Sequence, residues 1–362
     1  MMKSVSAWKQ ELSSGAHAAR LAALYCCAPD ETPAQAARYE AVLNGLDATF
    51  GPHAEAGLYS APGRTEIGGN HTDHNNGVVI AAAVNLDIIA VVAKNDENVV
   101  RVISHGFGKI DDVNLRDLTP QPVEAEHSAS LIRGVAAGIV KDGGKVGGFD
   151  CYTTSDVLGG SGLSSSAAFE VCMGAIFRGE YNDNDMKRFD QVKNAMISQY
   201  AENVFFGKPC GLMDQTACAV GKVITIDFKE VGHPVVREVP FDLAAKGFAL
   251  CISDTKGSHA DLTDDYAAVR REMESVAEFF GKKVLRDVDE ETFLKAIPEV
   301  RKVTGDRAVV RAIHFYNDSR RAGEIYEAIK ADDFDRFLQL IIEGGHSSFE
   351  FNQNAYSIKN PK

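Results

Sequence analysis

The order of apolar and polar residues along the chain predicts helices and strands that follow no regular repeat. Residues 16–27 and 33–50 are rich in Ala and Leu and predict two helices. Residues 84–104, VNLDIIAVVAKNDENVVRVIS, predict two strands around a polar turn at Lys94–Glu97. Further helices are predicted at 129–140, 167–178, 191–206 and 264–280, and further strands at 222–228 and 246–253. This order favours an α+β fold over a doubly wound sheet.

Composition and charge narrow the class of protein. The chain has 362 residues and a formal net charge of −13, so a broad nucleic-acid or anionic-membrane partner is not expected. No apolar run approaches the ~20 residues that a membrane span needs. The seven cysteines are odd in number and contain no CxxC pair, which is typical of reduced thiols in a cytoplasmic protein.

The segment GGSGLSSSAA at residues 159–168 has three interpretations: a flexible linker, a structural capping turn, or a phosphate-binding loop. An apolar helix follows it, which argues against a linker. The free N–H groups at a helix N-terminus attract anions, and glycine permits close approach of a phosphate. The segment matches neither the GxxxxGK[ST] loop nor the GxGxxG fingerprint, and it lacks the last glycine of a GxSxG elbow.

Two further segments concentrate polar side chains. In APGRTEIGGNHTDHNNG (61–77), Asp73 can accept hydrogen bonds from substrate hydroxyls and Arg64 supplies a fixed positive charge. A metal site at His71, Asp73 and His74 and a plain polar turn are the alternatives. In AENVFFGKPCGLMDQTACAVG (201–221), Asp214 is placed among apolar residues and can orient or deprotonate a hydroxyl, or simply cap the next helix.

Together, the three segments resemble the galactokinases of the GHMP kinase superfamily. GRTEIGGNHTDHNNG is similar to the signature GRxNxIGEHTDYNxG, DVLGGSGLSSSAA to the ATP loop PxGxGLSSSAA, and ENVFFGKPCGLMDQ to ExxFxGxPCGxMDQ. DLTDDYAAVRRE resembles a segment with a sugar-contacting tyrosine, and GGHSSFEFNQNAY resembles a late helical segment of bacterial members. The similarity runs from about residue 39 to the last residue.

The resemblance implies a role for each matching residue. It implies that Asp214 is the base or orienting group on the sugar C1 hydroxyl and that Arg64 stabilises charge. The implied sugar contacts are Asn70, His71, Asp73, Gly211 and Tyr266. The implied ATP loop consists of Gly160, Gly162, Leu163, Ser164, Ser165 and Ser166, and the implied Mg²⁺ ligands are Ser166 and Glu202. Phosphoryl transfer needs such positioning and charge more than covalent help.

The resemblance also implies a two-domain GHMP-kinase-like fold with the active site between the domains. We expect a helical extension at 1–38, an N-terminal kinase domain at 39–228 and a C-terminal domain at 229–362. The family's third motif, a glycine-rich segment near the C-terminus, is missing, so a truncated and incomplete C-terminal domain is expected. Asn70 replaces a glutamate that contacts the sugar O6, and Glu66, His74 and Leu158 are lesser departures.

The expected function is therefore an ATP- and Mg²⁺-dependent sugar 1-kinase in the cytoplasm, with galactose as the favoured substrate. An N-acetylhexosamine kinase, another GHMP small-molecule kinase and a non-catalytic galactokinase-like sugar sensor are the alternatives. The intact Arg64, Asp214 and GLSSSAA favour an enzyme, and PCGLMDQ together with HTDH favours a galactokinase.

Overall fold

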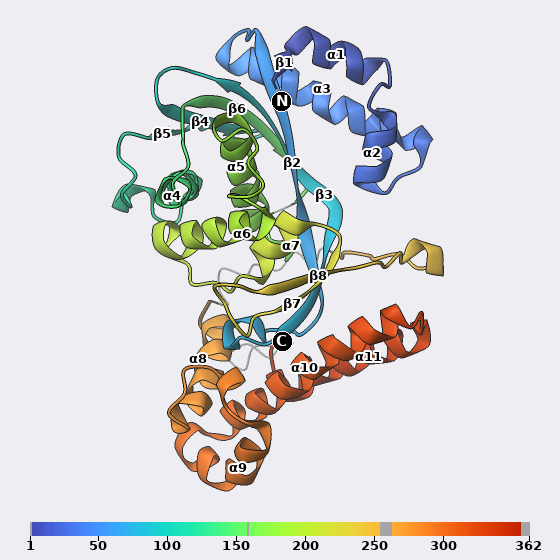
Figure 1. The fold of residues 1–362 in the computed structure, drawn as a ribbon, viewed down its shortest axis with the longest axis vertical. Coiled ribbons are helices and arrows are strands. Elements are labelled where there is room, and N and C mark those ends of the chain that lie inside the picture. Colours follow the sequence, from blue (N-terminus) through green and yellow to red (C-terminus); the bar gives the residue numbers. More distant parts are fainter. Residues whose placement is uncertain (1, 158, 254–262, 356–362) are drawn as a thin grey trace. The chain divides into compact units, whose positions relative to one another are not determined.

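The computed structural model describes residues 2–157, 159–253 and 263–355 (Figure 1). The chain divides into two compact units. Unit 1 comprises Met1–Arg64 and Ala83–Val220, and unit 2 comprises Thr65–Ala82 and Gly221–Lys362. The chain passes from one unit to the other three times. Two of these crossings lie inside strands β2 (Glu55–Gly68) and β3 (Val78–Lys94), and the third lies between Val220 and Gly221, in the segment that precedes β7 (Val223–Asp227).

Unit 1 is built on a mainly antiparallel sheet with helices on both faces. Its other elements are β1 (Lys3–Ser4), α1 (Val5–Ser13), α2 (Ala18–Tyr25), α3 (Thr32–Phe50), β4 (Val99–Ser104), β5 (Asp111–Asn114), α4 (Ser128–Lys141), β6 (Phe149–Ser155), α5 (Ser165–Tyr181), α6 (Gln191–Tyr200), the π-helical turn η4 (Ala201–Phe206) and α7 (Met213–Val220). The strand order is β1-β2-β3-β6-β4-β5. Strand β6 pairs antiparallel with β3 and parallel with β4.

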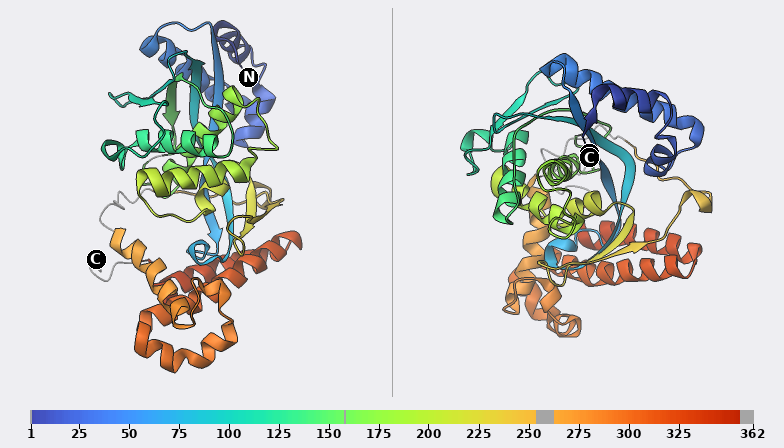
Figure 2. Two further views of the ribbon diagram at one scale, coloured as in Figure 1. Left: turned by 60° about the vertical axis from the view of Figure 1, so that its left-hand side comes forward. Right: turned by 45° about the horizontal axis from the view of Figure 1, so that its top comes forward.

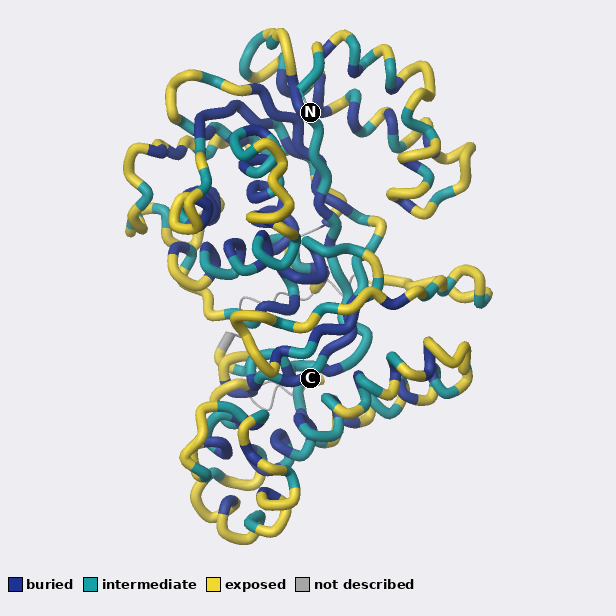
Figure 3. The backbone as a smooth tube through the Cα atoms, viewed as in Figure 1, coloured by how far each residue is buried: buried dark blue, intermediate teal, exposed yellow. Residues whose placement is uncertain are grey.

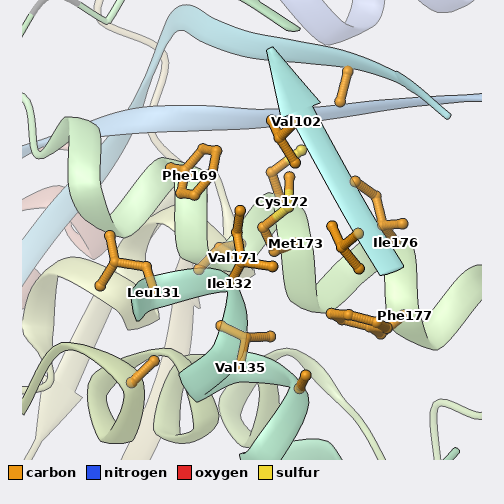
Figure 4. Close-up of a cluster of buried hydrophobic side chains, with 14 of the residues drawn as sticks. Val102, Leu131, Ile132, Val135, Phe169, Val171, Cys172, Met173, Ile176 and Phe177 are labelled. Atoms are coloured by element: carbon orange, nitrogen blue, oxygen red, sulfur yellow. The ribbon is translucent and has the colours of Figure 1, made fainter. Parts of the chain in front are cut away.

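Strand β3 separates the two cores of unit 1. Ile89 and Val91 face a cluster formed with α1, α2 and α3. Ile88 and Val92 face a cluster formed with α4 and α5, in which Phe169, Met173 and Phe177 pack near Leu131 and Val135 (Figure 4). Figure 2 shows the N-terminal helices and α5 on opposite sides of this strand, and residues 87–93 of the strand are among those coloured as buried in Figure 3. A strand covered on both faces has a continuous apolar run, as IIAVVA at residues 88–93 is.

Unit 2 joins the first part of β3 to a helical region. Its further elements are η2 (Asp73–Asn75), β7 (Val223–Asp227), β8 (Val235–Val239), α8 (Thr263–Phe279), α9 (Glu290–Thr304), α10 (Asp306–Lys330), α11 (Phe334–Ser347) and the π-helical turn η8 (Ser348–Asn352). Strand β7 pairs with residues 78–82 of β3 on one side and with β8 on the other. One core packs Ile80 against α10 and α11, and a second joins α8, α9 and α10.

The structure confirms the α+β class and most of the predicted elements, with three differences. Helix α1 was not predicted, and its Trp8 packs in the N-terminal core. The two strands of 84–104 are not neighbours, because β6 lies between them. The strand predicted at 246–253 is wrong: its apolar Phe248, Leu250 and Ile252 are exposed, and within the described ranges β8 pairs only with β7. An apolar pattern is therefore not enough to make a strand, because a strand also needs a neighbouring strand with which to pair.

The described ranges were also searched for membrane-spanning helices. None of their helices is both long and apolar enough to cross a bilayer.

Candidate active site

Arg64 and Asp214 form a two-pronged ion pair in unit 1. Arg64 lies on β2 and Asp214 in the first turn of α7, 150 positions apart in the chain. Arg64 Nε donates to Asp214 Oδ1 at 2.8 Å, and Nη2 donates to Oδ2 at 2.7 Å. Such a fork fixes the plane of the carboxylate as well as its distance. The side chains retain 14% and 32% of their exposure, so one edge of the pair is accessible to a ligand.

The glycine- and serine-rich loop packs directly beside this pair. Ser164 Oγ donates to Asp214 Oδ2 at 2.6 Å, and Arg64 Nη1 donates to the Gly162 carbonyl at 2.5 Å. Gly160, Gly162 and Ser164 all have positive φ, at 75°, 78° and 62°. An added Cβ on either glycine meets no atom of the described residues within 4 Å, so the positive φ is what favours glycine there.

The loop ends where α5 begins, at Ser165. Leu163 is buried, and its carbonyl accepts from the Arg64 backbone N–H at 3.1 Å, which fastens the loop to β2. The first turn of a helix presents N–H groups that have no partner within the helix, and the dipole of this 17-residue helix adds partial positive charge. These features together suit Ser164–Ser166 to an anion.

Glu202 forms a second acidic position behind the loop. It lies on η4 and is 2% exposed. Its Oε1 accepts from Ser166 Oγ and from Lys208 Nζ, both at 3.1 Å. Its Oε2 accepts from Gln215 Nε2 at 2.7 Å and from Cys210 Sγ at 3.3 Å. Lys208, Cys210 and Gln215 were not assigned roles from the sequence, although all three lie in or beside the GKPCGLMDQ segment.

Two carboxyl groups of the site have pKa values that are shifted in opposite directions, those of Asp214 and Glu170. Burial opposes ionisation of Asp214, but the Arg64 guanidinium and the Ser164 hydroxyl outweigh it, so the pKa of Asp214 lies below its ordinary value. Glu170 on α5 is fully buried, and burial together with the nearby Glu202 raises its pKa well above the usual range. Asp214 is therefore a charged acceptor at neutral pH.

The sugar-signature residues gather in unit 2, around the loop that precedes β3. Asn70, His71 and Asp73 lie on this loop. The His71 ring lies 5.9 Å from the ring of Tyr266, which is on α8. His74 Nδ1 lies 2.9 Å from the Asn75 side-chain amide, and burial lowers the pKa of His74 well below its ordinary value.

The structure thus places the candidate residues in two groups, one in each unit. Arg64, Asp214, Glu202 and the loop 160–166 belong to unit 1, as does Gly211 in the turn before α7. Asn70, His71, Asp73 and Tyr266 belong to unit 2. Within the described parts of the chain, no cluster of three or more His, Cys, Asp or Glu suits a metal ion, so the metal alternative at His71, Asp73 and His74 gains no support.

Comparison with known proteins decides the family. Residues 47–94 match the galactokinase galactose-binding signature, and residues 130–222 match the GHMP kinases N terminal domain. The galactokinase of Actinobacillus pleuropneumoniae is 35% identical over 294 residues, which cover 80% of this chain and 72% of that protein. The chain belongs to the galactokinase family. This membership makes it a phosphotransferase of the GHMP kinase type, as expected from the sequence.

Other members of the galactokinase family support the assignment. The Streptomyces coelicolor galactokinase is 31% identical over 297 residues, covering 81% of this chain and 73% of that protein. The crystal structure of Lactococcus lactis galactokinase complexed with galactose superposes with a TM-score of 0.71, at 19% identity over 87% of this chain and 80% of that one. This likeness confirms the GHMP-kinase-like fold.

Proposed function

We propose that this galactokinase-family chain transfers the γ-phosphoryl group of ATP to the C1 hydroxyl of galactose, giving ADP and galactose 1-phosphate. The observation that supports it most is the Arg64–Asp214 fork, with Ser164 of the helix-capping loop bonded to the same carboxylate. A fixed carboxylate, a guanidinium and an anion site occur together within unit 1. This is the set that phosphoryl transfer requires.

In this proposal Asp214 orients the sugar hydroxyl before it accepts the proton. Its lowered pKa makes it a weak base, so it does not ionise the free hydroxyl in advance. It accepts a hydrogen bond from the C1 O–H and receives the proton as the new O–P bond forms. The transition state is loose, so little base strength is needed. Arg64 balances the charge that develops on the transferring group and holds the carboxylate plane.

The N-terminus of α5 binds the triphosphate in this proposal. The Ser164–Ser166 segment offers backbone N–H groups, and Gly160 and Gly162 let a phosphate approach the backbone. The segment is held in place from β2 through the carbonyls of Gly162 and Leu163. Positioning of this kind, and not covalent chemistry, accounts for most of the acceleration in such enzymes.

The residues beside the loop also fit a magnesium ion. Ser166 and Glu202 offer a hydroxyl and a carboxylate within 3.1 Å of each other, and Mg²⁺ prefers such hard oxygen ligands while keeping several waters. When bound, Mg²⁺ neutralises phosphate charge. Lys208 Nζ contacts the same Glu202 oxygen, and its side chain is 62% exposed, so it is able to move aside for a cation.

The sugar is proposed to bind through Asn70, His71, Asp73, Gly211 and Tyr266. We place the reaction in the cytoplasm, where ATP is available. All seven cysteines are free thiols in the structure, which suits a reducing compartment.

Release of ADP by the purified chain across a panel of hexoses tests the function. We expect galactose to give ADP release in the presence of ATP and Mg²⁺, with galactose 1-phosphate identified by ³¹P NMR. Methyl galactoside, which has no free C1 hydroxyl, is the matched control and should give none. ADP release with methyl galactoside, or none with any hexose, contradicts the proposal. A stronger response to an N-acetylhexosamine would favour the alternative kinase.

A further inference from the structure

Asn70 is held by three hydrogen bonds from the last helices of unit 2. Its backbone N–H donates to Asp318 Oδ2 at 2.6 Å. Its carbonyl accepts from His314 Nε2 at 2.7 Å, and its side-chain amide donates to Ser348 Oγ at 2.7 Å. His314 and Asp318 lie one turn apart on α10, so a single helix contacts both polar groups of the Asn70 backbone.

Of the two neutral tautomers of His314, only one makes this contact. A backbone carbonyl only accepts, so Nε2 must carry the proton. Nδ1 lies 2.8 Å from Ser347 Oγ and accepts from that hydroxyl. The ring is fully buried, and burial lowers the pKa of His314, so the neutral imidazole with its proton on Nε2 is the stable form.

Asp318 is fixed as firmly as His314. It is 1% exposed, and its Oδ1 accepts from Arg321 one turn further along α10. The carboxylate is therefore held in one orientation in the interior, with Oδ2 directed at the Asn70 N–H. A buried carboxylate with both oxygens occupied holds its partners in one geometry.

The loop that begins at Asn70 has a backbone that needs such support. His71 and Asn76 have φ of 56° and 62°, a region that costs a residue with a side chain of order 1 kcal/mol or more. The Thr72 hydroxyl donates to the carbonyls of Gly69 and Val78, beside the loop and at the start of β3. Local bonds thus close the turn. The bonds from α10, and the Leu285 backbone N–H that donates to Asn75 Oδ1 at 3.0 Å, tie it to the rest of unit 2.

We propose that His314 and Asp318 are positioning residues that hold the Asn70–Asp73 loop in the form that binds sugar. They need not touch the substrate, because they act through the Asn70 backbone. We call the contacts of His314 and Asp318 with Asn70 the clamp. The inference rests on the proposed function for its link to sugar affinity, although the effect of the clamp on loop mobility can be measured without catalysis. A preformed loop spares the ligand the cost of ordering it, so loosening it weakens sugar binding.

Two variants of His314 separate the contact with Asn70 from the contact with Ser347. The amide nitrogen of His314→Gln reaches about as far as Nε2 and can still donate to the Asn70 carbonyl. The shorter His314→Asn reaches only the Nδ1 position, so it keeps the Ser347 side alone. Tyr316→Phe is the control on the same helix, because it removes hydrogen bonds to the Leu285 and Val288 carbonyls and none to Asn70. Leu285 contacts the loop through Asn75, so this control also tests whether support from outside Asn70 affects the sugar KM.

Steady-state kinetics and hydrogen exchange give the readouts. His314→Asn should raise the sugar KM about tenfold, the scale of one lost hydrogen bond, while the ATP KM stays within about twofold. Exchange of amides in residues 69–78 should quicken by a similar factor. His314→Gln should recover most of both effects. Tyr316→Phe should lower the urea midpoint but leave the sugar KM unchanged. Asp318→Leu should behave like His314→Asn, and if it does not fold, the His314 pair decides.

Three results would overturn the clamp. They are equal effects of the Gln and Asn variants, a sugar KM that rises as much in Tyr316→Phe, and unchanged exchange of residues 69–78 in His314→Asn. The exchange result holds whatever the wild-type chain phosphorylates. If galactose proves not to be a substrate, faster loop exchange in His314→Asn still supports the clamp, and the two failures remain distinct.

Discussion

Replacing Asp214 with Asn is the sharpest test of the reaction mechanism. The carboxylate accepts from Arg64 at 2.8 and 2.7 Å and from Ser164 at 2.6 Å. Asn keeps the shape and one acceptor oxygen but loses the charge and turns an N–H₂ toward a donor. The free energy of unfolding should fall by less than about 3 kcal/mol, the upper scale for one hydrogen bond to a charged group. A domain with about 5–15 kcal/mol of stability remains folded.

The effect on turnover should be much larger than the effect on stability. If Asp214 orients the hydroxyl and receives its proton, kcat should fall by roughly 10²–10⁴, which is about 2.7–5.4 kcal/mol in the barrier. ATP binding should survive, because the loop at Ser164–Ser166 is unchanged. Coupled detection of ADP gives kcat, and calorimetric titration gives ATP affinity.

Ser164→Ala is the matched control for Asp214→Asn. It removes one of the hydrogen bonds to the same carboxylate but leaves its charge, so kcat should fall about tenfold or less. The pKa of Asp214 is already lowered, so its contribution to the rate should be constant above pH 5 and lost only in stronger acid. Full turnover in Asp214→Asn, or equal losses in the two variants, would refute the reasoning.

The remaining predictions concern metal, backbone and buried charge. Glu202→Gln should raise the Mg²⁺ concentration for half-maximal activity, measured by metal titration, because a neutral amide binds Mg²⁺ weakly. Gly69→Ala should lower the melting temperature more than Gly51→Ala. Their φ values are 87° and 88°, but only the Cβ at Gly69 meets the Val78 carbonyl, at 2.3 Å, so equal melting temperatures would contradict this. Glu170 binds its proton more tightly in the folded chain than in the unfolded chain, because its pKa is raised on folding. As pH rises from 5 to 8, the free energy of unfolding of the wild type should therefore fall relative to that of Glu170→Gln, by up to about 1.4 kcal/mol per pH unit. Urea titrations at several pH values measure this difference. A constant difference would mean that Glu170 is ionised in the folded chain.

The sequence correctly predicted the helices and turns that depend on the pattern of neighbouring residues. The turn at Lys94–Glu97 and the helix after GLSSSAA follow from polar and apolar spacing that short-range geometry enforces, and the structure has both. The strand predicted at 246–253 failed because pairing depends on a neighbour that the segment's own alternation does not reveal. The insertion of β6 between β3 and β4 was hidden for the same reason.

Within the candidate site, the sequence motifs point to some of the residues, and only the fold reveals the others. The resemblance to galactokinase motifs implied roles for Arg64 and Asp214, although their fork spans 150 positions and only the fold brings them together. Lys208 and Gln215 could have been named as site residues from the sequence, since they lie in the motif ENVFFGKPCGLMDQ. His314 and Asp318 were not, because on α10 they read as ordinary polar residues of a helix. Only their contacts with Asn70, more than 240 positions earlier, show a role.

The passage of β2 and β3 through both units has a consequence for how the chain folds during synthesis. Unit 2 begins with residues 65–82, but β7, which pairs with them, starts at Val223, and Ser348 comes later still. A ribosome adds roughly 5–20 residues per second, and Ser348 follows Asn70 by 278 positions, so the loop waits roughly 14–56 seconds for this last partner. Unit 1 is able to form its own core first, while the bonds that hold Asn70 form only after α10 and η8 have emerged. The support that we propose for sugar binding is thus completed late in synthesis.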